Sequence, residues 1–115
     1  MNDVNEKVSY KGKEYKLVFN LNVMQVIQEK YGSVAEWWKK AYGANGEADV
    51  KAVIFRITEM FNEGIDMDND ENGADTAFLS HKQVGRIISA IGITEVTSKM
   101  SDVIVGSTES AEKNA

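Results

Sequence analysis

The apolar positions of the chain change their spacing once, at Asn20. Before this residue, from Lys7 to Phe19, β-branched and aromatic residues alternate with polar ones, which is the period of a β-strand. After it, apolar residues recur every three or four positions, which is the period of an amphipathic helix. The pattern predicts an α+β domain, mainly α, in which an N-terminal β-hairpin packs on a small bundle of four or five helices.

The segment 7–19 predicts a hairpin that turns near Gly12, because glycine adopts the positive φ that a tight turn requires. A two-residue loop of Gly12 and Lys13 would place Tyr10 opposite Tyr15. One face of the hairpin would then carry the side chains of Val8, Tyr10, Tyr15, Leu17 and Phe19. Because an isolated hairpin is marginally stable in water, we expect this face to pack against a helix.

Helix start and stop signals follow Asn20. Several predicted helices begin after a residue that can accept a backbone N–H, such as Asn20, Asp49 or Ser80, and several end before a glycine. The expected helices span residues 21–31, 34–42, 50–63, 81–91 and 94–105. Residues 1–106 would form a single domain, with loops over 43–48 and 64–78. The small polar residues 107–115 predict a disordered tail.

Six apolar residues are candidates for partner binding. Phe55 lies off the apolar stripe of its helix, which is therefore either covered on a second side or exposes an aromatic ring. Trp37 and Trp38 leave their helix about 100° apart, so that one is expected in the core and Trp38 is a candidate anchor. The alternative is that both tryptophans close the core.

The helix expected at 94–105 carries the other four candidates. Its composition is rich in Thr, Ser and Val, and such a weak helix must dock on something. It docks either on the core of its own chain or on a partner protein. We adopt docking on a partner as the hypothesis for the binding site. The apolar seam consists of Val96, Met100, Val103 and Ile104.

Composition excludes several classes of function. The chain of 115 residues has no cysteine, which rules out disulfides and thiolate metal sites. A formal net charge of -5 argues against binding nucleic acid over a broad basic face. The sequence shows neither a signal-peptide pattern nor an apolar segment of transmembrane length, so we expect a cytoplasmic protein that does not enter the membrane. It also lacks glycine-rich phosphate-binding motifs, which argues against an ATP-driven activity.

Two features begin like metal or catalytic sites and then depart from them. The stretch Asp66–Gly73 starts like a calcium loop, but its sixth position is Glu71 instead of Gly and the twelfth is Ala77 instead of Glu. His81 is the only histidine, whereas a zinc site or a nucleophilic triad needs several convergent groups. We therefore expect no cofactor, no metal and no enzymatic activity.

The order of the predicted elements resembles that of the tail assembly chaperones of siphoviruses and prophages of Gram-positive bacteria. This order is hairpin, Asn-capped helix, glycine stop, Ser-capped tryptophan helix and core helix. The segments that carry it are Tyr15–Asn22 and Tyr31–Trp38, and the likeness extends over residues 7–104. Its motifs are structural and include no catalytic residue set.

The resemblance implies a protein of the host cytoplasm that is absent from the finished virion. It would bind the tape measure protein, keep its apolar helices from aggregating without ATP, and help recruit tail tube protein. The resemblance also implies a second, longer form made by ribosomal frameshifting, and self-association is a further hypothesis. From the residues alone, the alternative is a small helical scaffolding or regulatory interaction domain without catalytic activity.

Overall fold

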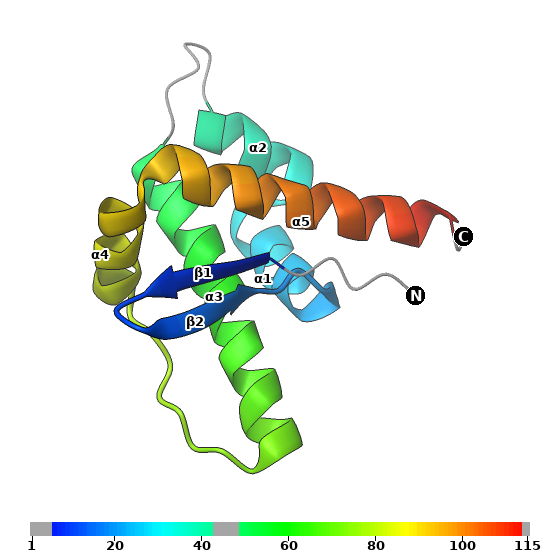
Figure 1. Ribbon diagram of the computed structural model, residues 1–115. Coiled ribbons are helices and arrows are strands. Elements are labelled where there is room, and N and C mark those ends of the chain that lie inside the picture. Colours follow the sequence, from blue (N-terminus) through cyan, green and yellow to red (C-terminus); the bar gives the residue numbers. More distant parts are fainter. Residues whose placement is uncertain (1–5, 43–48, 114–115) are drawn as a thin grey trace.

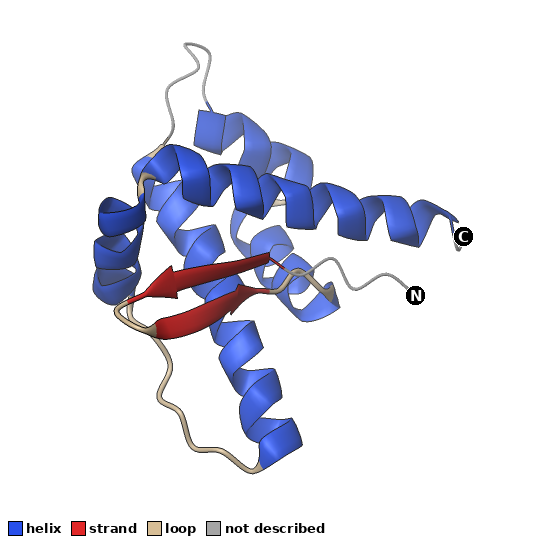
Figure 2. Cartoon of the chain, in the orientation of Figure 1, coloured by secondary structure: helices blue, strands red, loops and turns tan. Residues whose placement is uncertain are grey.

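The computed structural model describes residues 6–42 and 49–113 and shows an antiparallel hairpin followed by five helices (Figure 1). The elements are β1 (Glu6–Tyr10), β2 (Lys13–Leu17), α1 (Leu21–Tyr31), α2 (Val34–Tyr42), α3 (Val50–Asn72), α4 (His81–Ile91) and α5 (Ile93–Lys113). Figure 2 shows that β-structure within this part of the chain is limited to the hairpin. The predicted α+β class, mainly α, is confirmed. The loop predicted at 43–48 lies outside the described residues.

Helix α3 is the central element of the fold. It contacts α1, α2 and α4, and β2 lies across it. Helix α5 packs alongside β1 on the other side of the hairpin, while the second half of α3 extends beyond the hairpin (Figure 1). The hairpin is therefore held between a central helix and the C-terminal helix, as its marginal intrinsic stability requires.

The hairpin turns one residue earlier than predicted. Lys11 and Gly12 form the turn, with φ values of 50° and 79°, and this pair of positive angles is typical of a type I′ turn. Val8 therefore pairs with Tyr15, and Tyr10 pairs with Lys13, so that the predicted register is wrong by two residues. A shift of two positions leaves each side chain on its predicted face, which explains why Val8 and Leu17 are still buried.

The bounds of α1, α2 and α4 coincide with the expected ones, because local capping determines them. The Asn20 side chain accepts the backbone N–H of Val23 at 3.2 Å, and Ser33 Oγ accepts that of Glu36 at 3.0 Å. Ser80 and Gln83 form a reciprocal capping box at the start of α4. These caps satisfy N–H groups that a helix leaves unpaired at its first turn.

Helix α3 continues nine residues beyond its predicted end at residue 63, which corrects the assignment of a loop from Gly64 to Phe78. Gly64 is buried inside the helix, where it faces β2. A Cβ atom at this position would lie 3.2 Å from the Lys16 carbonyl oxygen and 3.5 Å from Val18 Cγ2. The glycine therefore allows close approach between helix and strand, and the helix ends at Gly73, which has the left-handed conformation.

Alanine substitutions at two helical glycines are expected to have opposite effects. Alanine raises helix propensity by about 1 kcal/mol relative to glycine, and a Gly85 Cβ would meet only Ile54 Cδ1 at 3.7 Å. Gly85→Ala should therefore stabilise the fold by about 0.5 to 1 kcal/mol. Gly64→Ala should instead destabilise it by about 1 to 2 kcal/mol, because the strand backbone must move. Urea unfolding followed by circular dichroism tests both, and equal stabilisation by the two variants would contradict the packing role of Gly64.

The core contains apolar side chains from the hairpin and all five helices. Trp37 is completely buried, and its Nε1 donates a hydrogen bond to the Ala52 carbonyl at 3.0 Å. The buried Arg56 guanidinium lies over the Trp37 ring at 4.0 Å and over the Phe19 ring at 5.2 Å. A cation between two aromatic faces gains cation–π attraction that strengthens where water is excluded. This cluster joins the N-terminal region, α2 and α3.

Two apolar residues at helix starts, which the helical spacing of apolar positions would include in the buried stripes, are exposed. Leu21, at the first position of α1, is 77% exposed, and Val50, at the first position of α3, is also exposed. In α1 the buried residues are Val23 and Ile27. Periodicity alone therefore overestimates the buried stripe at the first turn of these two helices.

Candidate partner-binding surface

The apolar seam of α5 is buried in the core of its own chain. Val96, Met100, Val103 and Ile104 are each at most 3% exposed, and the helix packs on β1, β2 and α4. This corrects the hypothesis that the seam docks on a partner. Helix α5 also starts one residue earlier than predicted and continues to Lys113, where the sequence analysis expected a disordered tail. Weak intrinsic propensity is compensated here by tertiary burial.

Phe55 is half-buried and covered on its second side. Its ring lies 5.8 Å from that of Tyr31 in an edge arrangement, and Lys30 Nζ lies 4.3 Å above it. The His81 ring approaches from the start of α4 at 6.2 Å. Of the two alternatives open for this helix, the structure shows the covered one. Phe55 therefore joins α1, α3 and α4, and it is not the exposed aromatic that the site hypothesis required.

Trp38 is half-buried and packs on the edge of the core. Its ring lies 4.9 Å from that of Trp37 in an edge arrangement, with 72° between the ring planes. The expectation that one tryptophan is core and the other peripheral agrees with these positions. Trp38, Phe55 and the seam thus belong to three helices, and the structure does not assemble them into one open apolar surface.

An open groove that the sequence analysis did not predict lies between α1 and α3. It has a volume of about 270 Å³. Helix α1 contributes Val23 and Val26, and Phe78 reaches it from the segment between α3 and α4. The full lining is Asn22, Val23, Val26, Glu59, Asn62, Glu63, Asp66 and Phe78.

Three carboxylates form the α3 side of the groove. Glu59, Glu63 and Asp66 are spaced i, i+4 and i+7, so that they share one face of the helix over two turns. Glu63 accepts hydrogen bonds from the side-chain amides of Asn20 at 2.6 Å and Asn22 at 3.0 Å. These bonds fix the Glu63 carboxylate beside α1, and the lining contains no basic side chain that would neutralise the acidic row.

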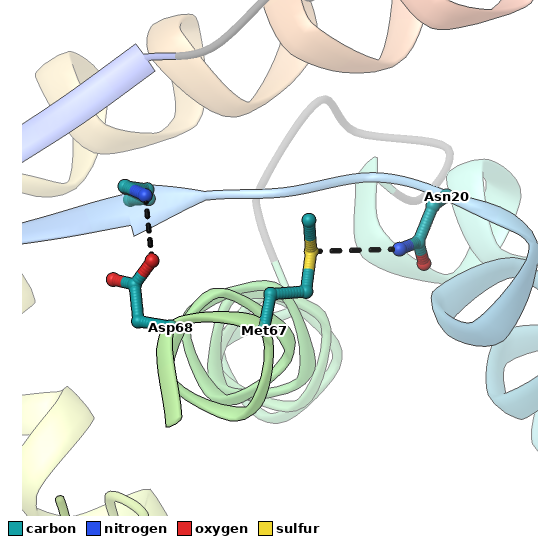
Figure 3. Close-up of polar contacts among 4 residues, drawn as sticks. Asn20, Met67 and Asp68 are labelled. Carbon is teal, nitrogen blue, oxygen red and sulfur yellow. Dashed lines mark hydrogen bonds and ion pairs between the residues drawn. The ribbon is translucent and has the colours of Figure 1, made fainter. Parts of the chain in front are cut away.

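The nearest described ion pair leaves this acidic row unneutralised. Lys16 Nζ donates to Asp68 Oδ1 at 2.8 Å, on a different side of α3 from the groove, and Figure 3 shows this contact next to Met67 and Asn20. The hydrogen bond from the ammonium to the Asp68 carboxylate raises the pKa of Lys16. Lys16 is thus paired with Asp68 and is not among the residues that line the groove.

One exposed aromatic side chain lies in the groove lining, and two other exposed apolar residues are neighbours of lining residues in the sequence. Phe78 is 57% exposed and forms part of its lining. Met67, which follows the groove residue Asp66, is 39% exposed, and its sulfur lies 4.0 Å from the Asn20 amide (Figure 3). The exposed Leu21 directly precedes the groove residue Asn22. An exposed aromatic side chain in the lining of a hollow is a feature of binding surfaces.

A second hollow, of about 700 Å³, lies at the turn between α4 and α5. It is lined by Ile91, Gly92, Ile93, Thr94, Glu95, Ser98 and Lys99. Its two charged side chains have opposite signs, and Lys99 Nζ donates to the Lys7 carbonyl at 2.8 Å. This hollow offers no charge pattern that would select a partner, so the α1–α3 groove is the stronger candidate.

Comparison of the chain with protein-family models, with curated proteins and with solved structures found no match. None of its described helices combines the length and apolar character needed to span a membrane.

The segment that began like a calcium loop is helical through Asn72. Alternate residues of a helix point in nearly opposite directions, so that Asp66, Asp68 and Asp70 cannot surround one ion as they would in a loop. Among residues 6–42 and 49–113, no group of three or more His, Cys, Asp or Glu side chains could hold a metal. His81 is exposed at the first position of α4, with its ring directed at Phe55.

Proposed function

We propose that this protein is an ATP-independent tail assembly chaperone of a long-tailed bacteriophage or prophage, which binds the tape measure protein and helps recruit tail tube protein. The arrangement of a hairpin, an Asn-capped helix, a Ser-capped tryptophan helix and a long core helix supports the proposal, because this order carries the resemblance. In this proposal it acts in the host cytoplasm and is absent from the finished virion.

The groove between α1 and α3 supplies the surface that such a function needs. A passive chaperone must hold apolar segments reversibly, and it must stay soluble while doing so. Exposed Phe78 offers apolar contact within the groove lining, whereas the three carboxylates of α3 keep the same region hydrated. This juxtaposition is the observation that supports chaperoning over a purely structural role.

Co-expression with the tape measure protein of the same phage or prophage tests the proposed function. We expect the tape measure protein to become soluble and to co-purify with this chain, without ATP. A matched culture that expresses the tape measure protein alone should yield mainly aggregates. A tape measure protein that stays insoluble and unbound would contradict the proposal and favour the alternative, a scaffolding or regulatory domain with another partner.

A further inference from the structure

We propose that the α1–α3 groove docks a basic amphipathic helix, in which Lys or Arg residues spaced i, i+4 and i+7 border an apolar stripe. This inference rests on the proposed function, since it defines which segments of a client the chain would hold. It commits to a partner helix as the occupant, and it is carried by the charge, the dimensions and the apolar contacts of the groove.

The charge of the groove selects a basic partner. Its lining holds three carboxylates and no cation, and Lys16, the closest described lysine of β2 to this part of α3, is engaged by Asp68. Glu59 and Asp66 have no hydrogen bond or ion pair with other described side chains, so both can accept a bond from outside the chain. Opposite charges on a partner would complement this row and steer its approach.

The spacing of the acidic row suits a helix. Glu59 and Asp66 are seven residues apart on α3, which corresponds to about 10 Å along the helix axis. Basic residues at i, i+4 and i+7 of a partner helix share one face over the same length. In an extended strand, residues on one face recur at every second position, and their spacing along the strand differs from the spacing of the three carboxylates along α3. Fewer of the strand's charges would therefore lie opposite a carboxylate.

The size of the groove favours side chains of a macromolecule over a small ligand. Its volume of about 270 Å³ lies below the range of about 300 to 1,000 Å³ that is typical of ligand pockets. Such a space accommodates a few apolar side chains beside Val23, Val26 and Phe78. Helix-in-groove binding uses an apolar stripe in this way, with residues three and four apart as anchors.

The test uses a fluorescein-labelled helical peptide with a leucine stripe and lysines at i, i+4 and i+7, together with a matched peptide in which glutamates replace the lysines. Fluorescence anisotropy should show that the full chain binds the lysine peptide at least tenfold more tightly than the glutamate peptide. Binding should weaken as salt rises, because exposed ion pairs are screened. Equal binding of the two peptides would overturn the proposal.

Variants of the groove locate the binding site. Glu59→Gln with Asp66→Asn should weaken binding of the lysine peptide about tenfold, as the loss of two partly exposed ion pairs predicts. The control pair, Glu14→Gln with Asp102→Asn, removes the same charge at exposed positions outside the groove and should leave binding within twofold. If both pairs weaken binding equally, general charge attraction explains it and the groove is not the site.

A second pair of variants tests the apolar contact. Phe78→Ser should weaken binding about tenfold, whereas Val105→Ser, at an exposed position of α5, should have no effect. Light scattering must show that the groove variants leave the oligomeric state unchanged. If they instead dissociate a dimer, the groove is covered by a second copy of the chain, and the proposal is wrong.

The two proposals fail in distinguishable ways. One outcome is that the double variant Glu59→Gln/Asp66→Asn no longer binds the lysine peptide and still solubilises the tape measure protein as well as the unmodified chain does. In that case the groove is not the site that holds the client, and the chaperone function stands. If the unmodified chain binds the lysine peptide in the groove and leaves the tape measure protein insoluble, the chaperone function fails and the groove remains a site for basic helices.

Discussion

Replacing Trp37 by alanine is expected to unfold the protein, or to leave it barely folded. The truncation of a buried tryptophan costs about 3 to 5 kcal/mol, against a total stability of about 5 to 15 kcal/mol for a domain of this kind. The change also removes the hydrogen bond from Nε1 to the Ala52 carbonyl and the ring that lies under Arg56. Urea unfolding followed by circular dichroism at 222 nm measures the loss.

Trp38→Ala is the matched control for this experiment. Its side chain is half-buried at the edge of the core, so we expect about half the loss of stability or less. Circular dichroism is preferable to fluorescence because each variant removes one of the two tryptophans. If Trp38→Ala destabilises the protein as much as Trp37→Ala, the assignment of Trp37 as the dominant core residue is wrong.

Replacing Met100 and Ile104 together by serine should abolish folding at room temperature. Each residue is buried against the chain's own core, and shortening a buried methionine or isoleucine costs about 2 to 5 kcal/mol. Burying two hydroxyl groups adds to the loss. The two positions are one turn apart, so their effects will not add strictly, yet the combined loss still approaches the total stability.

Val105→Ser provides the comparison on the same helix. Val105 is exposed, and a surface substitution of this kind changes stability by about 0.5 kcal/mol or less. Val105→Ser should therefore show a cooperative thermal unfolding transition, whereas the double serine variant should show none. A double serine variant that keeps its melting temperature while it loses self-association would show that the seam docks on another chain in solution, contrary to the structure.

Local signals in the sequence were sufficient to predict most helix ends. Ser33 and Ser80 cap α2 and α4 through short-range hydrogen bonds, and Gly32 and Gly92 follow the last residues of α1 and α4, so that these four helix ends lie where expected. The hairpin register was not predicted correctly, because it depends on whether Lys11 or Gly12 opens the turn. A lysine in the left-handed region costs about 1 to 2 kcal/mol, so that the sequence pattern favours Gly12 as the first turn residue, whereas in the fold Lys11 takes this position.

The candidate groove could not be predicted because one glycine was misinterpreted. The sequence pattern predicts a helix stop at Gly64, and only the close approach of this residue to β2 shows that it belongs inside the helix. With the helix ended at residue 63, the i, i+4, i+7 row of Glu59, Glu63 and Asp66 did not exist. The signal was present in the sequence, but its recognition required a tertiary contact between α3 and a strand about 50 residues earlier in the chain.

The seam of α5 illustrates a different limit. An apolar face on a weak helix has the same sequence pattern whether it packs on its own domain or on another chain. The decision depends on how much of the hairpin is left uncovered by the other helices, which is a property of the assembled fold. Sequence reasoning therefore identified Val96, Met100, Val103 and Ile104 as a unit and could not determine what the unit covers.

The meeting of the hairpin with α5 has a consequence for synthesis on the ribosome. Strand β1 emerges early, whereas the helices that pack on it, α4 and α5, emerge only after α3 is complete. Lys99 Nζ bonds to the carbonyl of Lys7, a residue 92 positions earlier. Contacts of such long sequence separation form late in folding. A nascent chain paused before residue 93 would therefore carry β1 without the helix α5 that packs on it, and the strand would stay accessible to general holdase chaperones until the domain closes.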